Sequence, residues 1–130
     1  MNKKSETTQQ FIKRKKEQFE KDKDKLIGMK DIGRKGRFYF IKEAITFMPQ
    51  HNLDEKVFII ERLRKAKTEG KITHTKGWKK GEIEYRVGYY IVGRIGRAEG
   101  KWIWGQFCPL IPKADFDKLI KKAKREGTIL

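Results

Sequence analysis

The sequence predicts an α+β fold, in which a small twisted antiparallel sheet of about three strands packs with two or three helices behind a basic N-terminal arm. Residues 82–96 alternate between two faces and are rich in Tyr, Val and Ile, which is typical of a long strand. Residues 113–126 carry apolar side chains three and four positions apart, which indicates an amphipathic helix. A length of 130 residues is that of one domain.

Residues 1–33 are interpreted as a basic flexible arm, and residues 34–130 as a single domain. Apolar residues are sparse in the arm, and charged residues separate Ile12, Phe19 and Leu26. Such a segment has little apolar surface to bury, so we expect it to be disordered or transiently helical when free. It is either a solvated tail with no task or an arm that follows phosphates and orders on contact.

Two helices are expected next, over residues 38–48 and 53–69. The first has apolar residues at helical spacing, and Pro49 should end it. Asn52 is the predicted N-terminal cap of the second helix. Gly70 is a natural stop for that helix.

The rest of the chain is expected to form the sheet and the last helix. Strands are predicted over 71–76, 82–96 and 101–108, and residues 77–81 form a turn bounded by glycines. The helix over 113–126 follows, with basic residues in its last turn, where they suit the helix dipole.

The hairpin of the last two strands is the most informative segment for function. A three-residue loop, 98–100, would place Ile95 opposite Ile103. The outer face of the hairpin would then gather Arg86, Tyr90, Arg94, Trp102 and Trp104. Aromatic rings interleaved with arginine suit the stacking of unpaired bases. Alternatively, a turn one residue longer or shorter would direct both tryptophans into the core.

Further candidate ligands of nucleic acid are basic clusters in the turns. These are Arg34, Lys35 and Arg37 in a short basic run, Lys76, Trp78, Lys79 and Lys80 at the glycine-bounded turn, and Arg97 in the hairpin turn. The basic side chains would contact phosphates. Trp78 would either stack on a base or form a lid over the core.

The charge predicts a polyanionic partner. Lys and Arg total 33 against 17 acidic residues, a formal net charge of +16. Such a field concentrates nucleic acid near the surface. We therefore expect a non-catalytic nucleic-acid-binding protein, with DNA slightly favoured over RNA. The alternative is a small basic subunit of a ribonucleoprotein or mobile-element assembly.

Other classes find less support. No segment approaches the roughly 20 apolar residues that a membrane span needs, so no membrane partner is expected. The single cysteine, Cys108, cannot form an internal disulfide, which favours the cytoplasm. No phosphate loop or zinc-ligand spacing indicates a cofactor or a metal. Glu82 and Glu84 leave a metal-dependent nuclease as a weaker alternative to a protein that is not an enzyme.

The segment from 53 to 81 resembles the closing half of a winged-helix domain. A helix over 53–69, then Gly70-Lys71-Ile72, then a hairpin with a basic tip follow in that order. The resemblance implies that the helix reads the major groove and that residues 76–81 form the wing.

Overall fold

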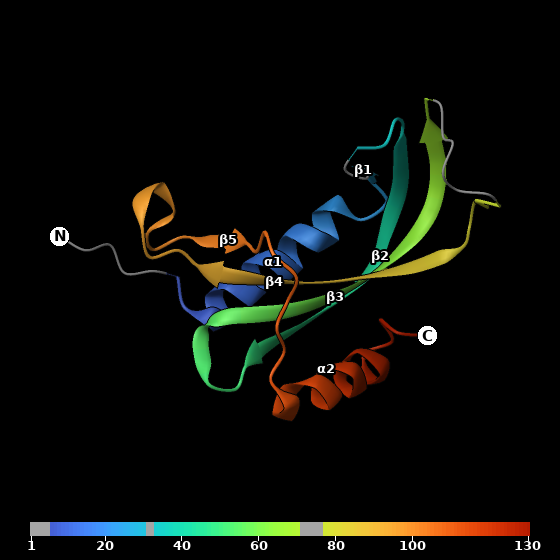
Figure 1. Cartoon of the computed structure of the whole chain (residues 1–130). Coiled ribbons are helices and arrows are strands. Elements are labelled where there is room, and N and C mark those ends of the chain that lie inside the picture. Colours follow the sequence, from blue (N-terminus) through green and yellow to red (C-terminus); the bar gives the residue numbers. More distant parts are fainter. Residues whose placement is uncertain (1–5, 31–32, 71–76) are drawn as a thin grey trace.

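A computed structural model describes residues 6–30, 33–70 and 77–130 and shows two helices and a five-stranded antiparallel sheet (Figure 1). In chain order the elements are α1 (Thr8–Asp22), β1 (Leu26–Met29), β2 (Arg37–Gln50), β3 (Leu53–Glu69), β4 (Ile83–Val92), the 3-10 turn η1 (Gly96–Ala98), β5 (Trp102–Trp104) and α2 (Lys113–Arg125). The strands lie side by side in the order in which they occur in the chain. The expected fold class is therefore wrong: the sheet has five strands rather than about three.

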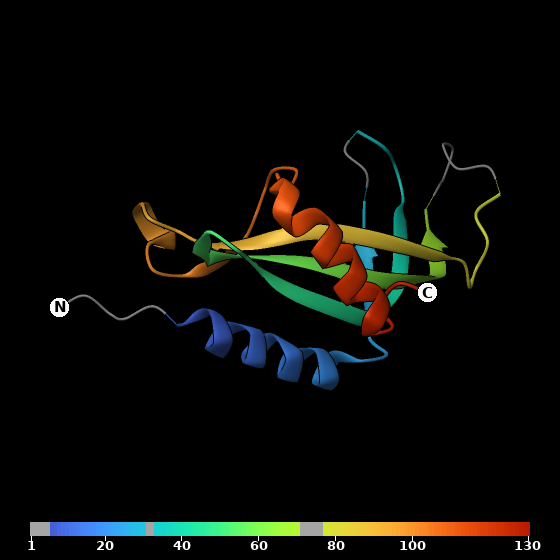
Figure 2. The same cartoon turned by 90° about the horizontal axis from the view of Figure 1, so that it is seen from below.

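The sheet curls into a half-barrel with one helix against each face; in Figure 2 α1 lies below the sheet and α2 crosses in front of it. The Sδ of Met29 on β1 accepts a hydrogen bond from the Nη1 of Arg86 on β4 at 3.8 Å, although two strands separate β1 from β4. This contact shows that the sheet bends towards the α1 face. The bend encloses part of that face, and both sides of the central strands are covered.

The two helices expected over 38–48 and 53–69 are the long strands β2 and β3, so this prediction is wrong. Residues 57–60 are all buried because α1 covers one face of β3 and α2 covers the other. A strand buried on both faces has a continuous apolar run instead of an alternating one. Such a run fits helical spacing as well, which explains the error.

Pro49 and Asn52 also have other roles than those expected. Pro49 lies inside β2, beside a register shift that follows it, and proline is tolerated at such irregularities. His51 and Asn52 form the short connection between β2 and β3, so Asn52 caps no helix. The resemblance to a winged-helix domain is also wrong, because residues 53–69, which would read the major groove as a helix, form a strand.

Most of the segment interpreted as a flexible arm is regular structure. Thr7 begins α1 with a capping box, in which Thr7 and Gln10 exchange side-chain and backbone hydrogen bonds. Phe11 and Ile12 are buried against Phe47, Val57 and Ile59. Helix α1 therefore belongs to the hydrophobic core of the domain.

The helix expected over 113–126 is confirmed as α2. Leu119 and Ala123 are fully buried against Phe58 and Ile60 on the opposite face of the sheet from α1. The buried Asp115 in the first turn accepts hydrogen bonds from the backbone N–H of His51, at 3.1 Å, and from its ring Nδ1, at 2.9 Å. The expected strand 71–76 lies outside the described residues.

The β4–β5 hairpin is shorter than predicted. Strand β4 ends at Val92 and β5 spans only Trp102–Trp104, so Ile91, and not Ile95, lies opposite Ile103. The connection is longer than three residues because it contains the 3-10 turn η1. The register differs from the expected one by four residues, an even number, so each side chain stays on its predicted face.

Candidate nucleic-acid interface

Exposed cations occur in two segments at one end of the sheet. The β1–β2 loop and the β3–β4 connection lie on the same side in Figure 1. They meet at two glycines with positive φ: a Cβ on Gly70 would lie 3.3 Å from the Cα of Gly36. Five exposed cations lie here, hereafter the loop end: Arg34, Lys35, Arg37, Lys79 and Lys80. Among the described residues, none of the five side-chain cations forms an ion pair within 4 Å, although the backbone N–H of Lys79 donates to the carboxylate of Glu82 at 3.0 Å. Lys76 lies outside the described residues.

Trp78 lies in the position of a lid. It packs against Phe38, Phe40 and Leu63, and the Nζ of Lys65 lies 5.7 Å from the centre of its ring. Its indole Nε1 is buried without a hydrogen-bond partner in the described part of the chain. Trp78 therefore covers the core beside the loop end and does not project from it.

Trp102 and Tyr90 share the predicted face with Arg86, but α1 covers them. The ring of Phe11 stacks on Trp102 at 4.5 Å between centroids and lies 5.0 Å from Tyr90. The indole Nε1 of Trp102 donates to the backbone carbonyl of Glu6 at 2.8 Å. These contacts make the two rings part of the core, so they form no open platform for bases.

Trp104 stays at the open edge of the sheet, 38% exposed. Its ring covers Gly88, where a Cβ would approach it to 2.5 Å, and meets Tyr90 edge-on at 5.1 Å. An aromatic ring over a strand glycine covers backbone that would otherwise be exposed. The guanidinium of Arg86 lies 5.2 Å from the Trp104 ring, within range of a cation–π contact.

Arg86 is held by an acid that the sequence analysis missed. Its Nε donates to Glu61 at 2.6 Å, and the Nζ of Lys42 lies 2.9 Å from the other carboxylate oxygen. Glu61 is 1% exposed, and its signal in the sequence is an acid inside the apolar run of β3. The charge of Arg86 is thus shared with a buried carboxylate and is less available to a phosphate.

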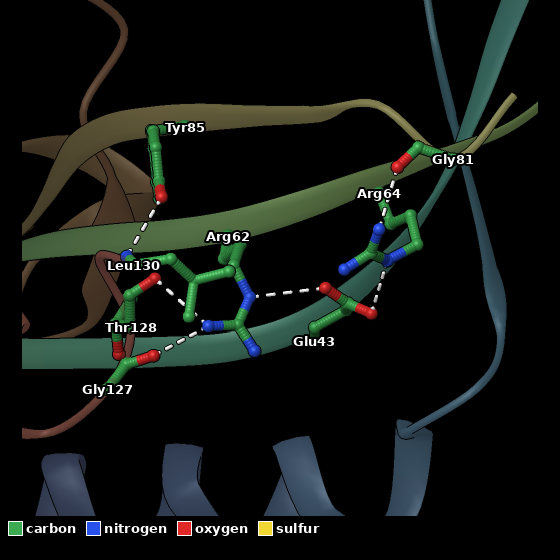
Figure 3. A network of polar contacts seen from close by, with 8 residues as sticks. All are labelled: Glu43, Arg62, Arg64, Gly81, Tyr85, Gly127, Thr128 and Leu130. Carbon is green, nitrogen blue, oxygen red and sulfur yellow. Dashed lines mark hydrogen bonds and ion pairs between the residues drawn. The ribbon is translucent and has the colours of Figure 1, made fainter. Parts of the chain in front are cut away.

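Other basic residues of β3 are also engaged in the fold (Figure 3). Arg62 and Arg64 share the carboxylate of Glu43 at 3.1 and 2.7 Å. The hydrogen bond from Arg64 is the largest effect on the pKa of Glu43; it exceeds the opposing effect of burial and, with the charge of Arg64 and the contacts of Arg62, holds this pKa below its ordinary value. Arg62 also donates to the carbonyl of Gly127 at 2.6 Å, which fastens the C-terminal segment to the sheet.

The remaining predicted ligands lie away from the loop end. Arg94 pairs with Glu55, its Nε donating at 3.0 Å, and Arg97 is exposed in η1. Both belong to the β4–β5 connection, at the opposite end of the sheet from the loop end in Figure 1. The predicted site residues therefore occupy three places instead of one surface.

The groups considered for catalysis are dispersed. Glu82 and Glu84 both pair with Lys65, each at 3.3 Å. Cys108 is exposed. Within residues 6–30, 33–70 and 77–130, no three His, Cys, Asp or Glu side chains gather as a metal site would require.

The described helices do not fit a membrane span, and comparisons with known proteins found no match. In the described part of the chain, neither helix has the length and apolar character that crossing a membrane demands. No protein-family model, no curated protein and no solved structure matches this chain.

Proposed function

We propose that this chain binds nucleic acid, DNA before RNA, without catalysing a reaction. The observation that carries the proposal is the loop end, where five exposed cations at one end of the sheet form no side-chain ion pair among the described residues. Cations that are not engaged in the fold are free to neutralise phosphates. Trp104, 38% exposed at the edge of the sheet, would add a contact with a base.

The mechanism requires a steep dependence on salt. If each of the five cations neutralises one phosphate of a duplex, log K falls against log salt with a slope of about −4.5. Affinity then falls about 500-fold between 50 and 200 mM salt. An affinity that barely changes over this range would exclude phosphate contacts as its main source.

The test compares two variants of equal charge. In one, the five cations of the loop end are replaced by Gln. In the matched control, five other exposed cations are replaced by Gln, namely Lys13, Lys16, Lys118, Lys124 and Arg125 on the two helices. Fluorescence anisotropy of labelled duplex and single-stranded oligonucleotides is measured over a salt series.

We expect the loop-end variant to lose most of the salt slope and the control to keep most of it. An equal loss in both variants would show that total charge, and not this surface, attracts the nucleic acid. Comparison of DNA with RNA in the same assay ranks the two ligands. Incubation of both with Mg²⁺ or Mn²⁺ tests the absence of catalysis, which cleavage abolished by Glu84→Ala would overturn.

A second candidate function is that of a subunit in a nucleoprotein assembly. Exposed apolar side chains favour it: Phe107 is 79% exposed, Leu110 81% and Phe116 56%. Leu110 and Phe116 line an open groove of about 610 Å³. Exposed apolar residues gathered in this way mark interaction surfaces. Retention of one partner after nuclease treatment, and its loss in Leu110→Asp, would favour this function.

A further inference from the structure

A small cavity lies between α1 and the sheet, on the face opposite to α2. Its volume is about 120 Å³, more than one water molecule requires. It is lined by Lys15, Gln18, Phe19 and Asp22 of α1, Lys42, Ile45 and Phe47 of β2, and Tyr90 of β4. The four residues of α1 recur at positions i, i+3, i+4 and i+7, so one side of the helix forms one wall.

Lys15 is a partly buried cation in this wall without an acidic partner. In the described part of the chain, no carboxylate lies within 4 Å of its Nζ. The Nζ lies 4.9 Å from the centre of the Tyr90 ring and donates a long bond, 3.5 Å, to Gln18. Burial lowers the pKa of Lys15, and the positive charges of Arg14 and Lys42 lower it further, against a smaller opposing effect of the charge of Glu6, which is itself paired with Arg14. A cation–π contact compensates less for lost hydration than an anion does.

Two more hydrogen-bond donors line the cavity. Lys42 gives one of its three N–H donors to Glu61 at 2.9 Å, which leaves two. The Tyr90 hydroxyl has no partner among the described residues. Burial, and then the charge of Glu61, raise the pKa of Tyr90, so this hydroxyl remains protonated and able to donate.

The acidic groups near the cavity are already engaged. Asp22, the one carboxylate on the described wall, pairs with Lys25 at 3.0 Å. The hydrogen bond from Lys25 holds the pKa of Asp22 below its ordinary value. Glu61 is shared between Lys42 and Arg86. Lys15 therefore faces the cavity with a charge that nothing on the described wall neutralises.

We propose that this cavity binds a phosphate group, held by the Nζ atoms of Lys15 and Lys42 and the Tyr90 hydroxyl. A tetrahedral oxyanion is of the size of the cavity, accepts from all three donors and supplies the negative charge that Lys15 lacks. Inorganic phosphate and the terminal phosphate of a nucleic acid share this chemistry. The site is separate from the loop end and does not depend on binding there.

The test titrates inorganic phosphate into nuclease-treated protein, with calorimetry for affinity and amide NMR shifts for location. We expect saturable binding with shifts confined to residues 15–22, 42–47 and 90. Lys15→Met should weaken binding at least about tenfold, as the loss of a charge-assisted hydrogen bond implies. Tyr90→Phe, which keeps the ring, should weaken it about threefold.

The matched control is Lys16→Met, because Lys16 is the exposed neighbour of Lys15 and has no ion pair among the described residues. It should bind phosphate as the unchanged chain does. Circular dichroism establishes that each variant is folded, and Lys15→Arg tests whether charge restores binding. Absence of saturable binding, or equal affinity in Lys15→Met and Lys16→Met, would overturn the proposal.

The source of the phosphate is decided in the loop-end variant, where backbone contacts are removed. There, a 5′-phosphorylated oligonucleotide is compared with the same oligonucleotide ending in a hydroxyl. Tighter binding of the phosphorylated form identifies a nucleic-acid terminus as the ligand. Equal binding of the two, with inorganic phosphate still bound, identifies the free ion.

Discussion

Glu61 is a buried acid whose charge is balanced by two cations from neighbouring strands. Lys42 and Arg86 approach its two oxygens at 2.9 and 2.6 Å, and its side chain is 2% exposed. Taking a carboxylate out of water is costly, and only close partners offset that cost. The two cations are also partly buried, so they in turn depend on the negative charge of Glu61.

Replacing Glu61 by Gln should lower the free energy of unfolding by about 3 kcal/mol, the scale observed when one member of a buried ion pair is removed. Urea unfolding followed by tryptophan fluorescence measures the change. Glu84→Gln is the control, because Glu84 is exposed and its pair with Lys65 should contribute less than about 1 kcal/mol. Equal effects of the two substitutions would contradict the role of burial.

Asp115 makes stability depend on pH in the acidic range. Burial alone would raise its pKa, but the hydrogen bonds from the ring and backbone of His51 outweigh burial and lower it. A carboxyl group with a lowered pKa in the folded state contributes stability above its unfolded pKa, and this is lost as pH falls through the folded pKa. The contribution should be complete at neutral pH and decrease progressively below about pH 4.

Asp115→Asn should therefore destabilise the chain by about 1.5 kcal/mol at pH 7 and by much less at pH 3. Unfolding in urea at both pH values gives the two differences. Asp117→Asn, at an exposed position of the same helix turn, should show little difference at either pH. A deficit in Asp115→Asn that is the same at both pH values would show that packing, and not charge, is responsible.

At the scale of elements, the contribution of α1 to the free energy of unfolding distinguishes a core helix from a flexible arm. Phe11 is 0% exposed and stacks on Trp102, so Phe11→Ala should lower the free energy of unfolding by about 3–5 kcal/mol. A flexible arm would give no change. Phe107→Ala, at a residue 79% exposed, is the control and should be nearly neutral. Chemical unfolding, with loss of the near-ultraviolet signal of Trp102, measures both.

An element can be predicted from the sequence when its apolar residues follow a single period, either helical or alternating. Helix α2 was found because its apolar residues lie at helical spacing against a charged background, and β4 because its residues alternate. Strand β3 was missed because helices cover both faces of residues 57–60 and erase the alternation. The two helices that cover β3, α1 and α2, lie more than 30 residues away from it in the sequence, beyond any local pattern.

The prediction of the candidate site was limited in the same way. The grouping of Arg86, Tyr90, Trp102 and Trp104 on one face was correct, because strand alternation is local. Their accessibility was not foreseeable, since it depends on α1, which comes almost 70 residues earlier. The loop-end cations were recognised as charge clusters, but their meeting at Gly36 and Gly70 depends on the pairing of β2 with β3.

At the scale of the whole molecule, the net charge of +16 should make folding itself sensitive to salt. The compact state gathers like charges, and their repulsion opposes folding. Exposed ion pairs such as Lys25–Asp22 act in the opposite direction, but each contributes only about 0–1 kcal/mol. Between about 10 and 300 mM sodium chloride the screening length falls from well above the molecular radius to below it. We therefore expect stability to rise by on the order of 2 kcal/mol.

Thermal unfolding in sodium chloride, without phosphate, measures this rise, and a fall in melting temperature with salt would contradict it. Both five-residue variants lower the net charge from +16 to +11, and repulsion scales with the square of the charge. Each should therefore show about half the salt-dependent rise of the unchanged chain. Stability should thus respond equally to charge removed from the loop end or from the helices, whereas binding should respond only to the loop end. This contrast separates the general effect of a basic protein from a surface that recognises phosphate.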